Sequence, residues 1–148
     1  MSRPIVIVGA GGHGREIAEI VLEAHRGAKG PPLFGIIDDF VTRLTGGPEG
    51  VEILGTLEWL AAHAEEVDVV VGLGDNRIRR NTVERCRQYG ARFGRAISPC
   101  AHLSSSASIG VGAMVFPGAV ISLNTRLGEH VIVGTNAGVS HDCSVGDF

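Results

Sequence analysis

The chain has 148 residues, of which 44% are apolar and 20% charged, and its formal net charge is −3. This length suits one or two small domains, and the apolar fraction is high enough for a packed core, which excludes a disordered chain. The slight negative charge gives no indication of a nucleic-acid partner, and no apolar run is long enough to span a bilayer.

The three cysteines, Cys86, Cys100 and Cys143, are odd in number and lack the spacing of a zinc site. They are typical of reduced thiols, and the sequence opens into an apolar run without the charged leader of a signal peptide. We therefore expect a cytoplasmic enzyme that binds no metal, no nucleic acid and no membrane.

The first hundred residues alternate between short apolar runs and segments with apolar residues at helical spacing. The pattern predicts strands at 4–8, 33–37, 67–71 and 91–97, and helices at 15–24, 57–64 and 78–89. Between them, residues 40–50 contain Gly and Pro and predict a mobile loop. Strands that alternate with helices indicate an α/β fold with a parallel sheet and right-handed crossovers.

From residue 103 onward the apolar period changes to six residues. The aliphatic positions are Leu103, Ile109, Val115, Ile121, Leu127, Val133, Val139 and Val145. Neither a helix nor an ordinary strand has this period, whereas a parallel β-helix stacks its side chains in ladders at such intervals. Each buried ladder residue is expected to stabilise the fold by roughly 1.5–3 kcal/mol. The sequence thus predicts about two and a third coils of a β-helix before Phe148.

A glycine-rich turn, Gly9 to Gly14, lies between the first predicted strand and the first predicted helix. Glycines allow close approach of a ligand, and a helix N-terminus attracts anions, so we expect a diphosphate here. The alternative is a tight turn without a ligand. The turn departs from the dinucleotide fingerprint because His13 stands in its middle and Arg15 follows Gly14, so NAD is not the first choice.

Two further loops are expected at the same edge of the sheet. Asp38 and Asp39 end the second strand, where carboxylates can accept hydrogen bonds from a ribose or a base, although a solvated turn is equally compatible. Residues 72–76 end the third long strand. Most arginines of the following helix are expected to face solvent, but Arg79 or Arg80 could reach a phosphate.

His141 and Asp142 are the candidate catalytic residues of the repeat region. A histidine beside an acid suits general-base chemistry, because its pKa lies near neutrality and an anion raises its basicity. Asp142 could instead point away, since adjacent strand residues face opposite sides, and His141 could be an ordinary surface histidine. A three-histidine metal site formed between subunits by His102, His130 and His141 is a further alternative.

Four segments, 8–14, 35–39, 72–76 and 140–148, together resemble the sialic acid O-acetyltransferase and bacillosamine N-acetyltransferase family, in order and spacing over the whole chain. The resemblance implies a Rossmann-like domain, residues 1–98, followed by a left-handed parallel β-helix, residues 99–148. It also implies a homotrimer that binds a nucleotide-linked sugar on the N-terminal loops and acetyl-CoA between neighbouring β-helices.

Carried over by motif, His141 is the general base and Asp142 the acid that supports it. The residues expected to contact the sugar nucleotide are Gly9, Gly11, Gly12, His13, Asp38, Asp39, Gly74 and Asn76. Family members often have Asn at the position of Gly134, for which Asn136 is the nearest substitute. They also continue for several further coils, so we expect this chain to be C-terminally short and most of the CoA surface to lie beyond Phe148.

The leading hypothesis is therefore an acetyl-CoA-dependent acetyltransferase that acts directly on an amino or hydroxyl group of a nucleotide-linked sugar, with a UDP-sugar as the expected substrate. One alternative is a non-catalytic nucleotide-sugar-binding module without the CoA coils. Another is a metal-dependent hydratase of the γ-type carbonic anhydrase kind, which lacks the N-terminal α/β domain.

Overall fold

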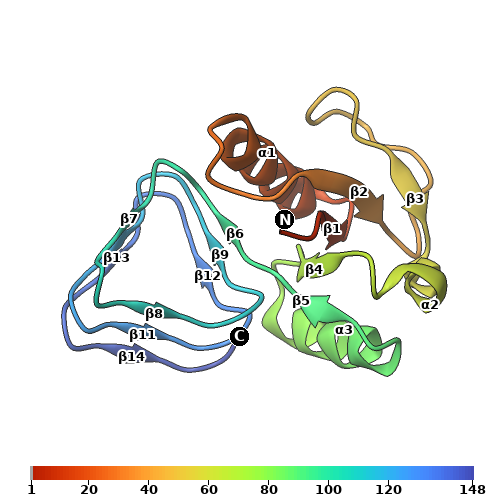
Figure 1. Cartoon of the computed structure of the whole chain (residues 1–148). Coiled ribbons are helices and arrows are strands. Elements are labelled where there is room, and N and C mark those ends of the chain that lie inside the picture. Colours follow the sequence, from red (N-terminus) through yellow and green to blue (C-terminus); the bar gives the residue numbers. More distant parts are fainter. Residues whose placement is uncertain (1) are drawn as a thin grey trace.

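The computed structural model describes residues 2–148, which form two parts that Figure 1 shows side by side. The α/β part contains strands β1 (Ile5–Val8), β2 (Leu33–Ile37), β3 (Ile53–Gly55), β4 (Asp68–Val71) and β5 (Arg92–Phe93). Its helices are α1 (Gly12–Arg26), the 3-10 helix η1 (Leu57–Trp59), α2 (Leu60–His63) and α3 (Asn76–Gln88).

The five strands of the α/β part form one parallel sheet in the order β3-β2-β1-β4-β5. This is the strand order of a Rossmann-like domain, and the predicted parallel α/β sheet is confirmed. Strand β3 was not predicted, because a half-buried edge strand of three residues leaves no apolar run in the sequence. The order reverses between β1 and β4, where ligands of such sheets bind beyond the carboxyl ends of the strands.

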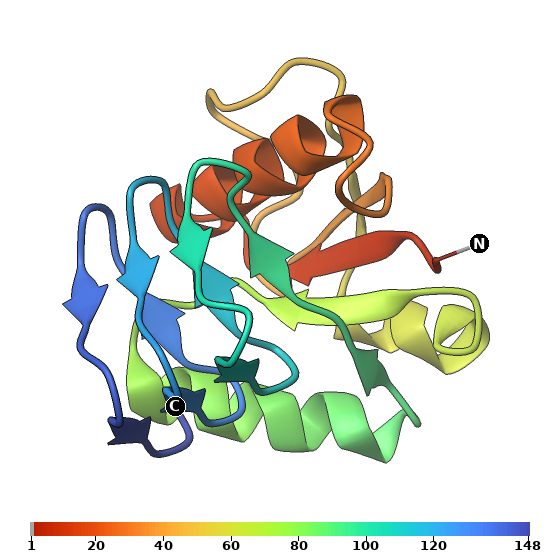
Figure 2. The same cartoon turned by 60° about the vertical axis from the view of Figure 1, so that its left-hand side comes forward.

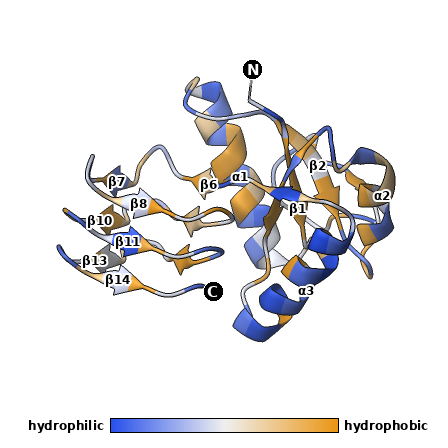
Figure 3. Cartoon of the chain, turned by 60° about the horizontal axis from the view of Figure 1, so that its bottom comes forward, coloured by the Kyte–Doolittle hydropathy of each residue, from blue (hydrophilic) through white to orange (hydrophobic). Residues whose placement is uncertain are grey.

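The two faces of the sheet are covered by different helices, as Figure 2 shows. Alternate residues of β1 point to opposite faces: Ile5 and Ile7 pack with α1, and Val6 and Val8 pack in the cluster that includes Val83 of α3. The outer surface of α3 is hydrophilic, as Figure 3 shows. Within residues 2–148, no helix is long and apolar enough to cross a membrane.

The second part, which we call the triangular coil (residues 96–148), consists of two-residue strands. They are β6 (Ala96–Ile97), β7 (His102–Leu103), β8 (Ser108–Ile109), β9 (Met114–Val115), β10 (Val120–Ile121), β11 (Arg126–Leu127), β12 (Ile132–Val133), β13 (Gly138–Val139) and β14 (Ser144–Val145). They pair in parallel into three sheets, β6-β9-β12, β7-β10-β13 and β8-β11-β14. Figure 1 looks along the stack and shows the three sheets as the sides of a triangle.

The coil begins one hexad earlier than the change of period at residue 103 suggests. The predicted strand 91–97 is two strands: β5 extends the α/β sheet, whereas β6 pairs with β9 and belongs to the coil. Ile97 continues the six-residue series backward from Leu103, and its side chain packs with the ladder residues inside the coil. The expected two and a third coils is therefore an undercount, because each sheet is three strands deep.

One side of the coil packs directly on α1. Met114 and Ala96, which point outward from the coil, are buried in the same apolar cluster as Ile17 and Val21 of the helix. Phe116, the residue that directly follows β9, is buried there as well. The two parts thus share one continuous core on this side, which fixes the coil against the α/β sheet.

His130 forms a second junction between the two parts. It occupies a left-handed turn of the coil at φ 57°, and its side chain is fully buried. Its ring stacks on Phe148 at 5.2 Å and meets Phe93 edge-on at 4.7 Å, and neither ring nitrogen has a hydrogen-bond partner in residues 2–148. Burial, aided by nearby arginine charges, lowers the pKa of His130 to about 4.

This histidine makes stability depend on pH. The pKa of His130 is about 4 in the folded chain and 6.5 as a model value, so the unfolded state binds more protons between these two values. We expect the contribution of His130 to be fully present above about pH 6.5 and to decline as pH falls toward 4, by on the order of 3 kcal/mol. Urea unfolding at about pH 7 and about pH 4.5 measures it.

The matched variant is His130→Phe, which keeps an aromatic ring between Phe93 and Phe148 but removes the titrating group. Its free energy of unfolding should fall less between the two pH values than that of the wild-type chain. His25→Gln, at an exposed position of α1, should behave like the wild type. Equal pH dependence in all three proteins would contradict the assignment to His130.

Candidate functional site

The three predicted loops meet at the carboxyl ends of the central strands. The Gly9 amide donates to the Ile37 carbonyl at 2.9 Å, and the Gly72 amide donates to the Val8 carbonyl at 2.8 Å. Ala10 in the glycine-rich turn donates its amide to Oδ2 of Asp38 at 2.8 Å. The structure therefore brings the turn after β1, the end of β2 and the loop after β4 into direct contact.

Two glycines of the turn are required by its geometry. Gly9 has φ 111°, a conformation that L side chains rarely adopt. A Cβ atom added to Gly14 would lie 1.9 Å from the Gly9 carbonyl oxygen, so α1 can begin this close to β1 only with glycine at that position. By contrast, a Cβ atom added to Gly11 would meet nothing within 4 Å.

The start of α1 presents polar groups to the space above the turn. Gly11 is the N-cap and makes no side-chain cap, and the first turn of any helix leaves backbone N–H groups without intrahelical partners. His13 follows and stacks on Phe116 of the coil, with 5.3 Å between ring centroids. Burial lowers the pKa of His13, as does the charge of Arg79, while Glu16 opposes the shift. The backbone donors at this helix N-terminus suit contact with a sugar diphosphate, and His13 lies beside them.

The two aspartates after β2 are largely engaged in holding the loops. Asp38 Oδ1 accepts the amides of Phe40 and Val41 at 2.8 and 2.9 Å, in addition to the bond from Ala10 to Oδ2. Asp39 accepts the Leu57 amide at 2.8 Å and pairs with Arg85 at 2.8 Å. The Leu57 amide first, and then Arg85, lower the pKa of Asp39. Both carboxylates remain next to a hollow, with lone pairs that a ligand can use.

Two hollows flank the glycine-rich turn. One has a volume of about 420 Å³ and lies between the end of β2 and α3, where Gly9, Asp38, Phe40 and Ile78 line it. Phe40 and Ile78 are exposed, at 94% and 57%, and give this hollow an apolar wall. The second has a volume of about 590 Å³ and includes Gly12, His13 and Glu16 in its lining. The turn therefore separates an apolar hollow from a polar one.

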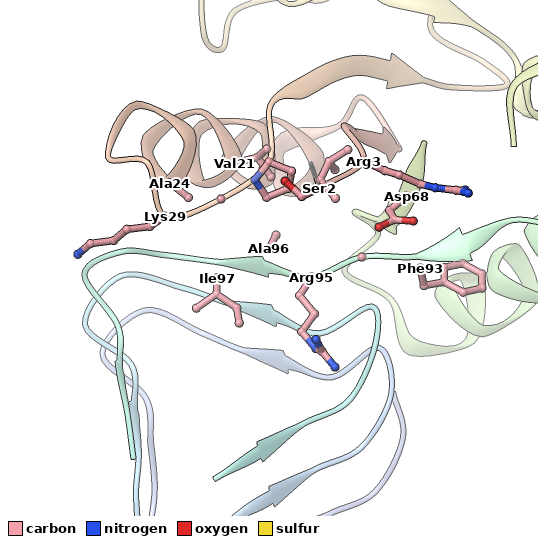
Figure 4. A pocket seen from close by; sticks show the side chains of 14 residues that line it. Ser2, Arg3, Val21, Ala24, Lys29, Asp68, Phe93, Arg95, Ala96 and Ile97 are labelled. Carbon is pink, nitrogen blue, oxygen red and sulfur yellow. The ribbon is translucent and has the colours of Figure 1, made fainter. Parts of the chain in front are cut away.

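A third hollow, of about 330 Å³, lies at the opposite, amino edge of the sheet. Figure 4 shows that Lys29 and Arg95 point apart there and that Arg3 extends toward Asp68. These charged groups do not converge on a common centre. None of the residues predicted to bind the sugar nucleotide lines this hollow.

Arg79 was predicted to face solvent or a phosphate, and instead it is buried, with 1% of its surface exposed. Its Nη1 donates to the carbonyls of Leu73 and Gly74 at 2.8 and 3.0 Å, and its Nη2 to Oδ1 of Asn76 at 2.9 Å. Its Nε donates to the His130 carbonyl at 3.0 Å. Two predicted contact residues, Gly74 and Asn76, are thus held in place by a side chain that helical spacing alone does not single out.

His141 and Asp142 contact each other on the coil. Nδ1 of His141 lies 2.8 Å from Oδ2 of Asp142, and the pair is exposed, at 74% and 65% of the side-chain surface. Asp142 has φ 58°, so its side chain does not alternate as it would in a strand and turns back toward His141. The hydrogen bond from His141, and then that from Asn124, lower the pKa of Asp142. Nε2 of His141 is left for an external proton donor.

Asn124 is a residue of this pair's surroundings that sequence analysis missed. Its Nδ2 donates to Oδ1 of Asp142 at 3.1 Å, and its backbone N–H donates to Oγ of Ser106 at 2.9 Å. Ser106, Asn124 and Asp142 are 18 residues apart, which is one full turn of the coil. A search of the sequence for polar residues spaced 18 apart would have found these three residues.

The predicted three-histidine metal alternative does not fit the structure. Within residues 2–148, no group of three or more histidine, cysteine or acidic side chains is arranged to hold a metal ion. His130 is fully buried against its own chain, whereas His102 and His141 are exposed, so the three cannot share an ion at a subunit boundary. All three cysteines are free thiols.

Known proteins match this chain both in the α/β part that carries the loops and over the whole chain with its coil. A family model described as the PglD N-terminal domain matches residues 4–86. The acetyltransferase domain of PglB from Neisseria gonorrhoeae, solved in complex with acetyl coenzyme A, superposes with a TM-score of 0.83 at 33% identity, over 99% of this chain and 69% of that one. The chain belongs to the PglD N-terminal domain family, whose relatives include nucleotide-sugar acetyltransferases.

Two further relatives carry a sugar nucleotide in their names or complexes. A variant of perosamine N-acetyltransferase from Caulobacter crescentus, in complex with CoA and GDP-perosamine, superposes with a TM-score of 0.84 at 31% identity, over 97% of this chain and 65% of that one. GDP-perosamine N-acetyltransferase of Escherichia coli O157:H7 is 28% identical over 144 residues, which are 96% of this chain. The chain spans 64% of the length of that enzyme.

The steric role of Gly14 can be tested against Gly11 in the same turn. Gly14→Ala should lower the free energy of unfolding by about 1–3 kcal/mol or more, because the added methyl group overlaps the Gly9 carbonyl. Gly11→Ala, where the same methyl group meets open space, should change it by no more than about 1 kcal/mol. Urea titration of the two variants measures both values, and similar losses in both would show that the turn tolerates a side chain at either position.

Proposed function

We propose that the chain acts in the cytoplasm as part of an acetyl-CoA-dependent N-acetyltransferase whose acceptor is the amino group of a nucleotide-linked sugar. The observation that carries the proposal is the exposed His141–Asp142 pair, in which Asp142 holds Nδ1 and leaves Nε2 available as a base. The relatives support the acetyl donor and the amino acceptor, because two of the solved structures contain acetyl-CoA or CoA and two relatives are named N-acetyltransferases.

The two hollows beside the glycine-rich turn suggest how a sugar nucleotide lies. The nucleobase would occupy the 420 Å³ hollow against Phe40, and the polar edges of the nucleobase would lie near Asp38 and Asp39. Its diphosphate would then lie over the backbone donors at Gly11 and Gly12, where a helix N-terminus favours anions. The sugar would reach the polar hollow beside His13. We expected a UDP-sugar, whereas the relatives name GDP-perosamine, so the proposal covers both nucleotides.

Within one chain, the proposed general base His141 and the proposed sugar site lie on opposite sides of the coil. The β6-β9-β12 side packs on α1, whereas His141 follows β13 and precedes β14, at the corner that joins the other two sides (Figure 1). This corner is opposite the side that faces the sugar loops. We therefore propose that His141 of one copy serves the sugar loops of another, in a homotrimer of left-handed β-helices.

Direct transfer accounts for the residues. The amino nitrogen of the sugar attacks the thioester carbonyl carbon of acetyl-CoA, a C–N bond forms, the C–S bond breaks and CoA leaves as the thiol. Nε2 of His141 accepts the proton lost by the amine and returns a proton to the departing sulfur. Asp142 holds the N–H of the ring at Nδ1, which directs Nε2 to the amine, and Asn124 fixes Asp142 in turn.

Replacing the base should separate catalysis from binding. His141→Ala should lower the rate of thiol release from acetyl-CoA by about 10²–10⁴-fold while leaving sugar-nucleotide affinity nearly unchanged. Asp142→Asn should lower the rate without affecting the same affinity. A His141→Ala protein with wild-type turnover would remove His141 from its role, and binding without turnover in the wild type would favour a non-catalytic sugar-nucleotide module.

Shared sites can be tested by mixing two inactive variants. Gly11→Asp places a carboxylate where the diphosphate is proposed to lie, at a position with open space, so this variant should fold but not bind. Co-expressed in equal amounts with His141→Ala, it should recover about one quarter of the wild-type rate, because half of the sugar loops and half of the bases are intact in random mixtures. A site within one chain would recover no activity.

A further inference from the structure

The Arg79 guanidinium is a buried cation without a counter-anion. All four of its hydrogen bonds go to neutral oxygens: the carbonyls of Leu73, Gly74 and His130 and the amide oxygen of Asn76. In the part of the chain that the structure describes, no carboxylate lies within 4.0 Å of it. Asp75 acts on it only through space and is fully exposed to solvent.

Such an arrangement is unusual because a buried charge is normally paired. Removing a cation from water is unfavourable, and nearby dipoles offset only part of that loss. Two other arginines of α3 are paired: Arg85 with Asp39, and Arg87 with Glu84 and Glu129. Arg79 therefore keeps a positive charge that no group of the described chain neutralises.

This charge lies beneath the proposed sugar-nucleotide site. Arg79 holds the carbonyls of residues 73 and 74, and the same loop packs against the glycine-rich turn. A Cβ atom added to Gly9 would meet the Leu73 side chain at 2.7 Å and the Gly72 carbonyl oxygen at 3.1 Å, which shows how closely the two loops approach. The charge is also felt at the start of α1, since it is one of the groups that lower the pKa of His13.

We propose that Arg79 is a positioning residue for the sugar nucleotide, in which one side chain fixes the 72–76 loop to the coil at His130 and supplies an uncompensated positive charge that attracts the diphosphate. This inference rests on the proposed function and deepens it. Arg79 does not touch the ligand in this arrangement. Its hydrogen bonds set the shape of the loop, and its charge acts through the low-dielectric floor of the site, where charges are screened less than in water.

The charge and the geometry can be separated by three substitutions. Arg79→Lys keeps the charge and loses the planar fork, whereas Arg79→Gln loses the charge. Asn76→Asp keeps the guanidinium and its hydrogen bond but gives it the missing carboxylate at 2.9 Å. Arg77→Gln, at an exposed position two residues away, is the control for a loss of one positive charge.

The experiment is calorimetric titration of the folded variants with UDP and GDP, and with the uncharged nucleosides uridine and guanosine. We expect Arg79→Gln and Asn76→Asp each to weaken diphosphate binding about tenfold or more, while nucleoside binding changes by less than about threefold. Arg79→Lys and Arg77→Gln should retain diphosphate affinity within about fivefold.

Asn76→Asp keeps the experiment decisive if Arg79→Gln does not fold, because it alters the charge and leaves the buried network in place. Equal diphosphate affinity in Asn76→Asp and wild type would overturn the inference and leave the proposed function standing. Parallel losses for nucleoside and diphosphate would also overturn it, since they indicate a structural role alone. A wild-type chain that binds neither UDP nor GDP would overturn the proposed sugar-nucleotide site itself.

Discussion

The contact between α1 and one side of the triangular coil decides how the rest of the molecule is arranged. Met114 and Ala96 point out of the coil and into the core that also covers the α/β sheet, so one outer side of the coil is apolar and buried, whereas the outward residues of the other two sides are exposed. Because burial of apolar surface is the main favourable term in folding, this side cannot leave α1 without exposing the sheet's own core. The orientation of the two parts follows from that shared core.

The same contact places the candidate site residues in two separate regions of the chain. His13 lies where α1 meets the coil, stacked on Phe116, and the loops of the α/β sheet open beside it. His141 lies at the corner of the coil opposite α1. A triangular coil has three corners, and docking one side leaves the opposite corner free. In the proposed assembly a neighbouring copy packs against that free corner.

Charged residues of the α/β part fix the conformation of the loops through hydrogen bonds within the chain. Asp38 caps the loop after β2 and binds the glycine-rich turn through Ala10. Arg79 holds the loop after β4 and reaches across to the coil. The loops are thereby preorganised, which lowers the conformational entropy that they would lose on binding a ligand. Asp38 and Arg79, on either side of the glycine-rich turn, hold these loops without forming an ion pair with each other.

The sequence alone determined the features that depend on local periodicity. Buried parallel strands appear as continuous apolar runs, the coil appears as aliphatic residues six apart, and the turn between the first strand and the first helix appears as the glycine-rich segment from Gly9 to Gly14. The family resemblance and the candidate pair His141 and Asp142 also came from short motifs, although the contact between the two side chains came from the structure. Such signals lie within one element or one repeat, where spacing along the chain fixes position in space.

Tertiary structure decided what depends on neighbours far apart in the chain. Ile97 belongs to the coil because it pairs with Val115, 18 residues later, although it follows a strand of the sheet directly. Arg79 is buried because the coil carbonyl of His130, 51 residues away, covers it, while the helix pattern of α3 resembles a solvated face. Asn124 reaches Asp142 only because one turn of the coil stacks on the next. Burial and long-range hydrogen bonds arise from tertiary packing, and the spacing of residues within one segment does not determine that packing.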